Sequence, residues 1–360
     1  LIARVNLAAT YVFLANTEKA RPVIERILSS TKQRKLKLLH GNALELLAQV
    51  CIQEKDYSGA RIALNQSYDQ LARSKTIGLF FVKKWQTILD LKKLKDPSLA
   101  KQSMQDLRRE ALDLKHWETI RHCDFYELQS NYNENLFQHL YCGTPYSEFR
   151  NRVDEDFDKR PKKYFFWCPQ QNYAEAQEGI DLLVAQSLEG KLKLKPLQLH
   201  HRLLLALSED FYRSFGIGHL FGRLFHGEYF NPITSPERVY KAVARFRQWT
   251  KKEGIDLNLV EDQGHYRLES ENPDYGILVP SQRPKDLSSA TVYSHRLKSK
   301  WKQKDFSAKQ AIEELDISRA QWNLICRDLT KKGLKSQGQG PAKRFTFSSQ
   351  TLTRLKSRKF

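Results

Sequence analysis

A recurrence of forty residues in the first third of the chain is the feature that most constrains its fold. Five apolar or small positions recur at this distance: Leu7 and Leu47, Ala8 and Ala48, Tyr11 and Cys51, Ala20 and Ala60, Ile24 and Leu64. Ile88, Leu91 and Ala100 continue the spacing into a third unit. A small residue at one fixed point of each unit lets two helices approach closely. Because such a unit cannot bury its own apolar face, the recurrence predicts stacked pairs of helices.

The second unit resembles a tetratricopeptide repeat. Its stretch LELLAQVCIQEKDYSGARIALNQSY carries Ala48, Tyr57, Ala60 and Leu64 at the spacing of that family. The family repeat has about 34 residues, so these units are stretched, as in some bacterial transcriptional regulators. The resemblance covers residues 1–115, with less regular helices to about residue 140, and implies a groove that binds a protein or peptide partner. An ordinary helical domain with alanine-rich contacts is the alternative.

A helix with one apolar and one basic face is expected over residues 235–252. A hydroxyl of the Thr234-Ser235 pair is predicted to cap it, and Pro236 and Glu237 suit its first turn. Short strands are expected at residues 180–186 and 191–197, followed by helices at 199–207 and 215–225. After the basic helix, a hairpin is expected around Gln263 and Gly264, with strands at 257–260 and 265–268.

This order of elements resembles the OmpR/PhoB-type winged-helix domain, which binds DNA. The helix reads Arg-Val and then Arg-Phe-Arg, and the hairpin ends His-Tyr-Arg-Leu, with His265 where the family usually has glycine. The resemblance implies that the third helix enters the major groove and that the wing contacts phosphate. Arg247, two residues after Arg245, lies off this line of positive charge and suits an acidic partner or a phosphate. The candidate DNA contacts are Arg238, Lys241, Arg245, Arg247 and Arg267.

The last fifth of the chain is strongly basic and repeats the same order of elements. Residues 285–360 contain 18 Lys and Arg against 6 Asp and Glu, a net charge of +12. Helices are expected at 292–302, 307–315 and 319–332, with strands at 334–337 and 343–347 flanking a glycine-rich turn. This stretch looks like the generic winged helix of bacterial regulators. The candidate DNA contacts are Arg319, Asn323, Arg327, Lys343 and Arg344.

We therefore expect a mainly α fold with small β-sheets (α+β), in which a helical-repeat array is followed by two winged helix-turn-helix domains. The predicted division is residues 1–140 for the repeats, 141–177 for a linker and first strands, and 178–272 for the first winged helix. Residues 273–290 are predicted to form a linker, 291–349 the second winged helix and 350–360 a basic tail. The chain opens on Leu1, which suggests a fragment or a trimmed product.

Several classes of function find no support in the sequence. No run of about 18 apolar residues exists, so no membrane-spanning helix is predicted. The five cysteines are odd in number and lack a CxxC motif, which favours reduced thiols and a cytoplasmic location. His122-Cys123 and His139-x-x-Cys142 form only a faint zinc pattern, so no metal is predicted. No catalytic or phosphate-loop motif occurs, and neither an enzyme nor a cofactor is expected.

The net charge of +19 favours a polyanionic partner. The leading hypothesis is a DNA-binding transcriptional regulator whose winged helices bind double-stranded DNA and whose repeats receive a protein or ligand signal. The alternative is an interaction scaffold whose winged helices dock proteins. The oligomeric state, the target site and the sense of regulation stay open.

Overall fold

The computed structural model describes residues 1–72, 76–93, 97–169, 178–282 and 287–347. The described chain is mainly α-helical with three small β-sheets, as predicted. It divides into two compact units. Unit 1 contains residues 1–140 and 146–159, and unit 2 contains residues 141–145 and 160 onward.

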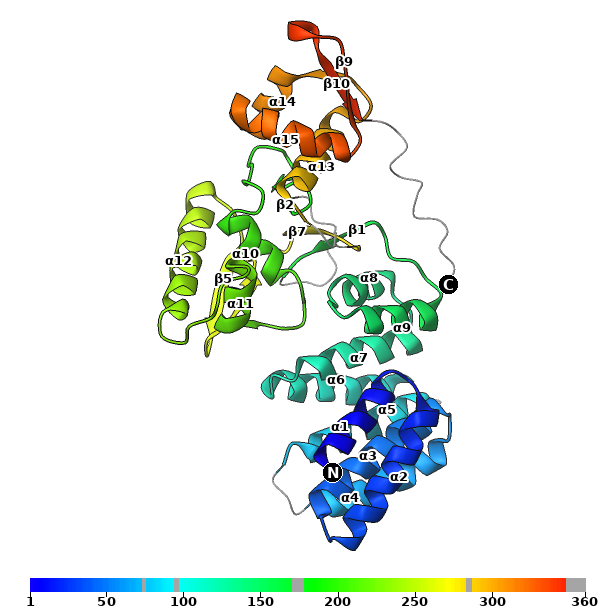
Figure 1. Ribbon diagram of the computed structural model, residues 1–360. Helices are drawn as coiled ribbons and strands as arrows, with labels where there is room; N and C mark the ends of the chain where they lie inside the picture. Colours follow the sequence, from blue (N-terminus) through cyan, green and yellow to red (C-terminus); the bar gives the residue numbers. More distant parts are fainter. Residues whose placement is uncertain (73–75, 94–96, 170–177, 283–286, 348–360) are drawn as a thin grey trace. The chain divides into compact units, whose positions relative to one another are not determined.

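Unit 1 is built from antiparallel helices joined by short turns (Figure 1). The first three are α1 (Ile2–Phe13), α2 (Thr17–Gln33) and α3 (Lys37–Gln53). They are followed by α4 (Tyr57–Leu71), α5 (Gly78–Lys93), α6 (Pro97–Asp113) and α7 (Trp117–Ser130). Helices α2, α4 and α6 begin at residues 17, 57 and 97, so the forty-residue period of the sequence is also the period of the helices.

The turns of unit 1 repeat as regularly as its helices. Ala15, Lys35, Lys55 and Lys115 each adopt a left-handed backbone with φ between 53° and 64°. These positions are twenty or sixty residues apart, and each lies between consecutive helices. A left-handed residue closes a helix and reverses the chain, so the same turn is used again and again without glycine.

The small residues of the recurrence lie where the helices pack. Ala8, Ala20 and Ala60 are fully buried, and Ile24 and Leu64 are buried beside them. The side chain of Ala100 lies outside the described residues. These alanines let neighbouring helices approach closely, as the sequence predicted.

The helical region extends further than the sequence indicated. Helix α8 (Glu134–Cys142) is followed by α9 (Ser147–Phe157), which belongs to unit 1. The prediction of a linker from residue 141 is therefore wrong at its start. Phe149 and Val153 are buried and pack α9 against the rest of the unit. Residues 154–158, most of which are acidic, form the C-terminal end of this helix.

Unit 2 begins with a four-stranded sheet in the order β1-β7-β2-β3. Its strands are β1 (Tyr164–Trp167), β2 (Glu178–Asp181), β3 (Gln186–Ser187) and β7 (Tyr275–Pro280). Strand β7 pairs antiparallel with β1 and parallel with β2. The predicted linker 273–290 is thus wrong, because its first half is an inner strand of this sheet. The strand predicted at 191–197 is also wrong, since this segment makes only one isolated bridge, between Lys193 and Gln186.

Three helices and a second sheet follow in the middle part of unit 2, which we define as residues 164–282. They are α10 (Leu199–Leu207), α11 (Ile217–Leu224) and α12 (Ser235–Glu253). Strands β4 (Phe215–Gly216), β5 (Asn258–Asp262) and β6 (His265–Glu269) form a sheet in the order β4-β6-β5. The hairpin turns through Gln263 and Gly264, with φ of 51° and 76°. His265 therefore lies in a strand and needs no positive φ.

The C-terminal part of unit 2, residues 287–347, contains the three helices and two strands that the sequence predicted, and adds a two-residue strand between the first two helices. It contains α13 (Ser289–Trp301), β8 (Phe306–Ser307), α14 (Ala308–Leu315) and α15 (Arg319–Lys331). Strands β9 (Leu334–Gln337) and β10 (Arg344–Phe347) complete a sheet in the order β8-β10-β9. Trp322, Phe306 and Phe345 lie in its core. The predicted tail 350–360 lies outside the described residues.

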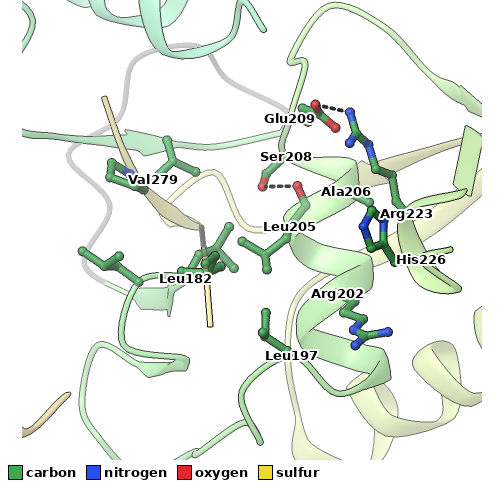
Figure 2. A pocket seen from close by; sticks show the side chains of 13 residues that line it. Leu182, Leu197, Arg202, Leu205, Ala206, Ser208, Glu209, Arg223, His226 and Val279 are labelled. Carbon is green, nitrogen blue, oxygen red and sulfur yellow. Dashed lines mark hydrogen bonds and ion pairs between the residues drawn. The ribbon is translucent and has the colours of Figure 1, made fainter. Parts of the chain in front are cut away.

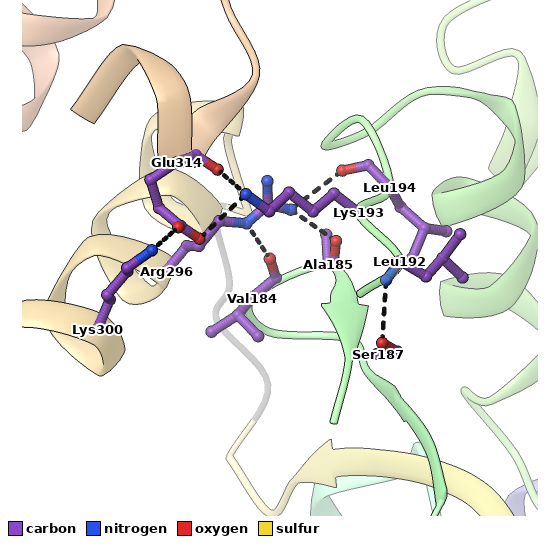
Figure 3. A network of polar contacts seen from close by, with 9 residues as sticks. All are labelled: Val184, Ala185, Ser187, Leu192, Lys193, Leu194, Arg296, Lys300 and Glu314. Carbon is purple, nitrogen blue, oxygen red and sulfur yellow. Dashed lines mark hydrogen bonds and ion pairs between the residues drawn. The ribbon is translucent and has the colours of Figure 1, made fainter. Parts of the chain in front are cut away.

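A buried arginine joins the two parts of unit 2 (Figure 3). Arg296 of α13 is 1% exposed. Its Nε donates to the carbonyl of Val184 at 2.8 Å, and its Nη2 donates to those of Ala185 at 2.6 Å and Leu194 at 3.1 Å. Lys193 reinforces the contact by donating to the carbonyl of Glu314 at 2.8 Å. A buried charge with this many acceptors fixes one arrangement of the two segments.

Candidate nucleic-acid interface

Helix α12 carries the first predicted set of basic residues. Val239, Val243 and Phe246 are buried on one face, which leaves the opposite face to solvent. Its start differs from the prediction, because the hydroxyl of Thr234 makes no capping hydrogen bond. Instead, Asn231 Oδ1 accepts from the backbone N–H of Ile233 at 2.9 Å, and Ser235 Oγ accepts from that of Asn231 at 2.9 Å.

Arg238, at the first exposed turn of α12, is held by its own chain. Its Nη1 donates to Glu228 Oε2 at 2.5 Å and its Nη2 to Glu228 Oε1 at 3.1 Å. The guanidinium also lies over the ring of Phe225, 3.9 Å from its centroid. The hydrogen bonds to Glu228 raise the pKa of Arg238 and lower that of Glu228. The predicted contact of Arg238 with DNA would therefore require that the arginine first leave Glu228.

Three further predicted contacts of the middle part also have partners within the chain. Lys241 pairs with Glu237 at 2.7 Å, and Arg267 pairs with Glu269 at 2.6 Å. Arg247 differs from both, since its Nε and Nη2 donate to the carbonyl of Leu259 at 3.0 and 2.7 Å. The side chain of Arg247 thereby ties α12 to strand β5, and its predicted contact with an acid or a phosphate stays a prediction.

Arg245 is the exception on α12. It is exposed and forms no ion pair with any residue that the structure describes. It lies one turn beyond Lys241 on the same face. Among the five basic residues predicted for the middle part, Arg245 alone offers a guanidinium without an internal partner in the described chain.

Helix α15 presents a more open set. Ser318 caps the helix by accepting from the backbone N–H of Gln321 at 3.2 Å, and the Gln321 side chain returns a bond to Ser318. Trp322 and Leu329 point inward and are buried. Arg319, Asn323 and Arg327 are exposed at intervals of four residues, which aligns them along one stripe of the helix.

The hairpin after α15 adds positive charge. Lys343 and Arg344 are exposed before and at the start of β10. The Lys343 ammonium lies 5.5 Å from the centroid of the Phe345 ring. Lys335, on the paired strand β9, is also exposed, and the sequence analysis did not single it out. In β9 only Leu334 is buried, and the three residues that follow it face solvent.

The two sets of basic residues therefore differ in their availability. Within the described chain, Arg319, Arg327, Lys343 and Arg344 form no ion pair, whereas Arg238, Lys241 and Arg267 each have a carboxylate partner. An unpaired cation attracts phosphate without first losing a partner. The C-terminal part thus carries the stronger candidate interface.

The faint zinc pattern gains no support from geometry. Burial lowers the pKa of His139 to about 3 and raises the pKa of Cys123 to about 11, so both are neutral near pH 7. In the part of the chain that the structure describes, no three His, Cys, Asp or Glu side chains cluster as metal ligands. No helix in these ranges is both long enough and apolar enough to cross a membrane.

Comparisons of the chain with protein-family models, with curated proteins and with solved structures gave no match.

Proposed function

We propose that this chain is a transcriptional regulator that binds duplex DNA, with α15 and the β9–β10 hairpin as its principal contact. The observation that carries the proposal is the set of unpaired basic residues on these two elements, Arg319, Arg327, Lys343 and Arg344. The winged-helix order of elements supports it, because that order presents a third helix to the major groove and a hairpin to the backbone.

The side chains suit this division of work. Arginine donates two hydrogen bonds to guanine and asparagine two to adenine, so α15 is placed to read bases. Lys343 and Arg344 on the hairpin suit phosphate, which gives affinity without sequence choice. In the middle part, Arg245 adds a contact directly, and Arg238 adds one after it exchanges Glu228 for a phosphate.

Unit 1 is proposed to bind a protein or peptide that signals to the regulator. A cleft of about 330 Å³ lies among its first helices and is lined by Val5, Leu38, Asn42, Glu45 and Phe81. It combines apolar walls with an amide and a carboxyl, as a peptide site requires. On the resemblance to bacterial regulators, we propose a cytoplasmic location.

The test is a titration of the chain against random duplex DNA, with binding measured by fluorescence anisotropy at several salt concentrations. We expect affinity to fall steeply with salt, since each neutralised phosphate contributes a slope of about 0.9 in log K against log salt. Replacing Arg319, Arg327, Lys343 and Arg344 together by alanine should remove most of the binding.

A matched variant replaces Arg4, Arg26, Lys32 and Arg34 of unit 1, which are exposed and carry the same total charge. It should bind almost as the parent chain does. Equal loss in both variants would show that net charge alone drives binding. No binding at low salt would sink the proposal and favour the protein-docking alternative.

A further inference from the structure

A cleft of about 500 Å³ lies over one face of α10 in the middle part of unit 2 (Figure 2). Its floor comes from Arg202, Leu205 and Ala206, which share that face because they are three and four residues apart. The volume is in the range of pockets that bind small molecules. No residue of the proposed DNA interface lines it.

The two sides of the cleft differ in chemistry. Figure 2 shows Leu182, Leu197 and Val279 to one side of α10, and Arg223 and His226 to the other. Apolar walls on one side favour a hydrocarbon or ring, since burying apolar surface away from water is favourable. The basic side favours a head group of opposite charge.

The charge balance at the basic side is positive. Glu209 Oε1 accepts from Arg223 Nη2 at 2.5 Å, so one arginine already has a carboxylate. Among the residues that the structure describes, Arg202 has one hydrogen-bond partner, the carbonyl of Leu224, to which its Nη1 donates at 2.9 Å. Two arginines thus face a single lining carboxylate, and the cleft keeps an excess of positive charge and free donors.

The apolar wall is fixed before any ligand arrives. Buried His201 accepts from the backbone N–H of Leu197 at 3.0 Å through Nδ1, while its Nε2 lies 2.9 Å from the carbonyl of Leu182. Burial lowers the pKa of His201 to about 4, so the ring is neutral and Nε2 donates. Leu197 is held at φ 58°, a conformation that a leucine rarely adopts. A wall held in one shape lowers the ordering cost of binding.

We propose that this cleft binds a small organic monoanion with an apolar tail, such as an aliphatic carboxylate. The tail lies against Leu182, Leu205 and Val279, and the carboxylate faces Arg202 and Arg223. The site goes beyond the proposed DNA binding and does not depend on it, because it uses a different surface of the same unit.

The test uses the full chain and calorimetric titration with decanoate, below the concentration at which it forms micelles. Decyltrimethylammonium, which has the same alkyl chain and a positive head, is the matched probe. We expect saturable binding of one decanoate per chain, and much weaker binding of the cation. Equal binding of both probes, or no saturable binding of decanoate, would overturn the proposal.

Two variants locate the site. Leu205→Trp fills the cleft and should weaken decanoate binding by about tenfold or more. Arg223→Gln keeps the surface chain but removes the charge, and should weaken binding by about fivefold. Leu188→Trp, at an exposed leucine of the same part that does not line the cleft, should bind as the parent does.

Arg223 is half exposed, so its replacement tests the head-group contact even where Leu205→Trp fails to fold. Full decanoate affinity in Arg223→Gln and in a folded Leu205→Trp would place binding elsewhere and refute the assignment. If the parent chain binds decanoate but not DNA, the result counts against the proposed function and not against this site.

Discussion

Arg238 and Glu228 face each other as a two-point ion pair, with donor–acceptor distances of 2.5 and 3.1 Å, above the ring of Phe225. The arginine that begins the basic face of α12 is thereby occupied by its own chain. Both side chains are partly exposed, so solvent weakens the pair. A phosphate can replace the carboxylate at small cost, so in the proposed DNA binding Arg238 contributes only after this exchange.

Glu228→Gln should therefore raise the affinity for duplex DNA by about threefold, because it releases Arg238 at no loss of packing. The measurement is anisotropy at fixed salt. Glu189→Gln removes the same charge at another exposed position of unit 2 and supplies the control. An identical gain in both variants would show that Arg238 does not reach DNA.

Single replacements on α15 should act on sequence choice. Arg327→Ala is expected to weaken binding to a selected site by roughly 1–3 kcal/mol, with little change on random DNA. Arg245→Ala on α12 should cost as much if both helices read bases. An unchanged affinity for the selected site would remove the substituted arginine from the interface.

The hairpin should behave differently. Replacing both Lys343 and Arg344 by alanine is expected to weaken all sequences alike and to lower the salt slope by about 2. Competition between selected and random duplexes, measured across the salt series, separates the two effects. A loss confined to the selected site would make the hairpin a reader of bases.

Arg296→Met should be the most destabilising of these replacements, by about 3 kcal/mol or more, because it removes three hydrogen bonds to buried carbonyls. The carbonyl of Ala185 keeps a second donor, the backbone N–H of Leu194, whereas those of Val184 and Leu194 lose the arginine. Urea unfolding of the full chain measures the change. Arg319→Met, at an exposed arginine of the same part, should unfold as the parent does. A loss below 1 kcal/mol in Arg296→Met, on the order of an ordinary surface change, would contradict the structural role.

Glu45 should make the stability of unit 1 depend on pH. Burial raises its pKa from 4.5 to about 7, although the charge of Lys84 opposes the shift. The folded chain therefore holds a proton that the unfolded chain releases, and the resulting stabilisation is complete below pH 4.5 and lost as pH rises towards 7. Glu45→Gln should flatten this fall, by roughly 1–3 kcal/mol in calorimetry. A parent chain in which unit 1 unfolds at the same temperature at pH 5 and pH 7 would contradict this prediction.

Local patterns predicted most of the helices. The 199–207 prediction coincides with α10, and the 319–332 prediction differs from α15 by one residue at its end. Such features depend on residues within one or two turns of each other. The forty-residue recurrence in unit 1 could also be found in the sequence. The structure repeats one turn conformation in this region, at Ala15, Lys35 and Lys55.

Long-range pairing was not visible. Strand β7 lies more than a hundred residues from its partner β1 along the chain. The local sequence around Tyr275 therefore does not predict this pairing. The segment 191–197 has the composition of a strand, but the carbonyl of Leu194 is taken by Arg296. The candidate site shows the same limit: the sequence identified the basic residues but not which of them face an acid.

The grip of Arg296 on Val184, Ala185 and Leu194 has a consequence for anyone who divides this protein. A fragment starting near residue 287 would keep α15 and the β9–β10 hairpin. The guanidinium of Arg296 would then be exposed to solvent, without the three carbonyls that it binds in the full chain. The two parts must be expressed, exchanged or grafted together. A substitution that disturbs either part at this contact therefore affects the folding of both.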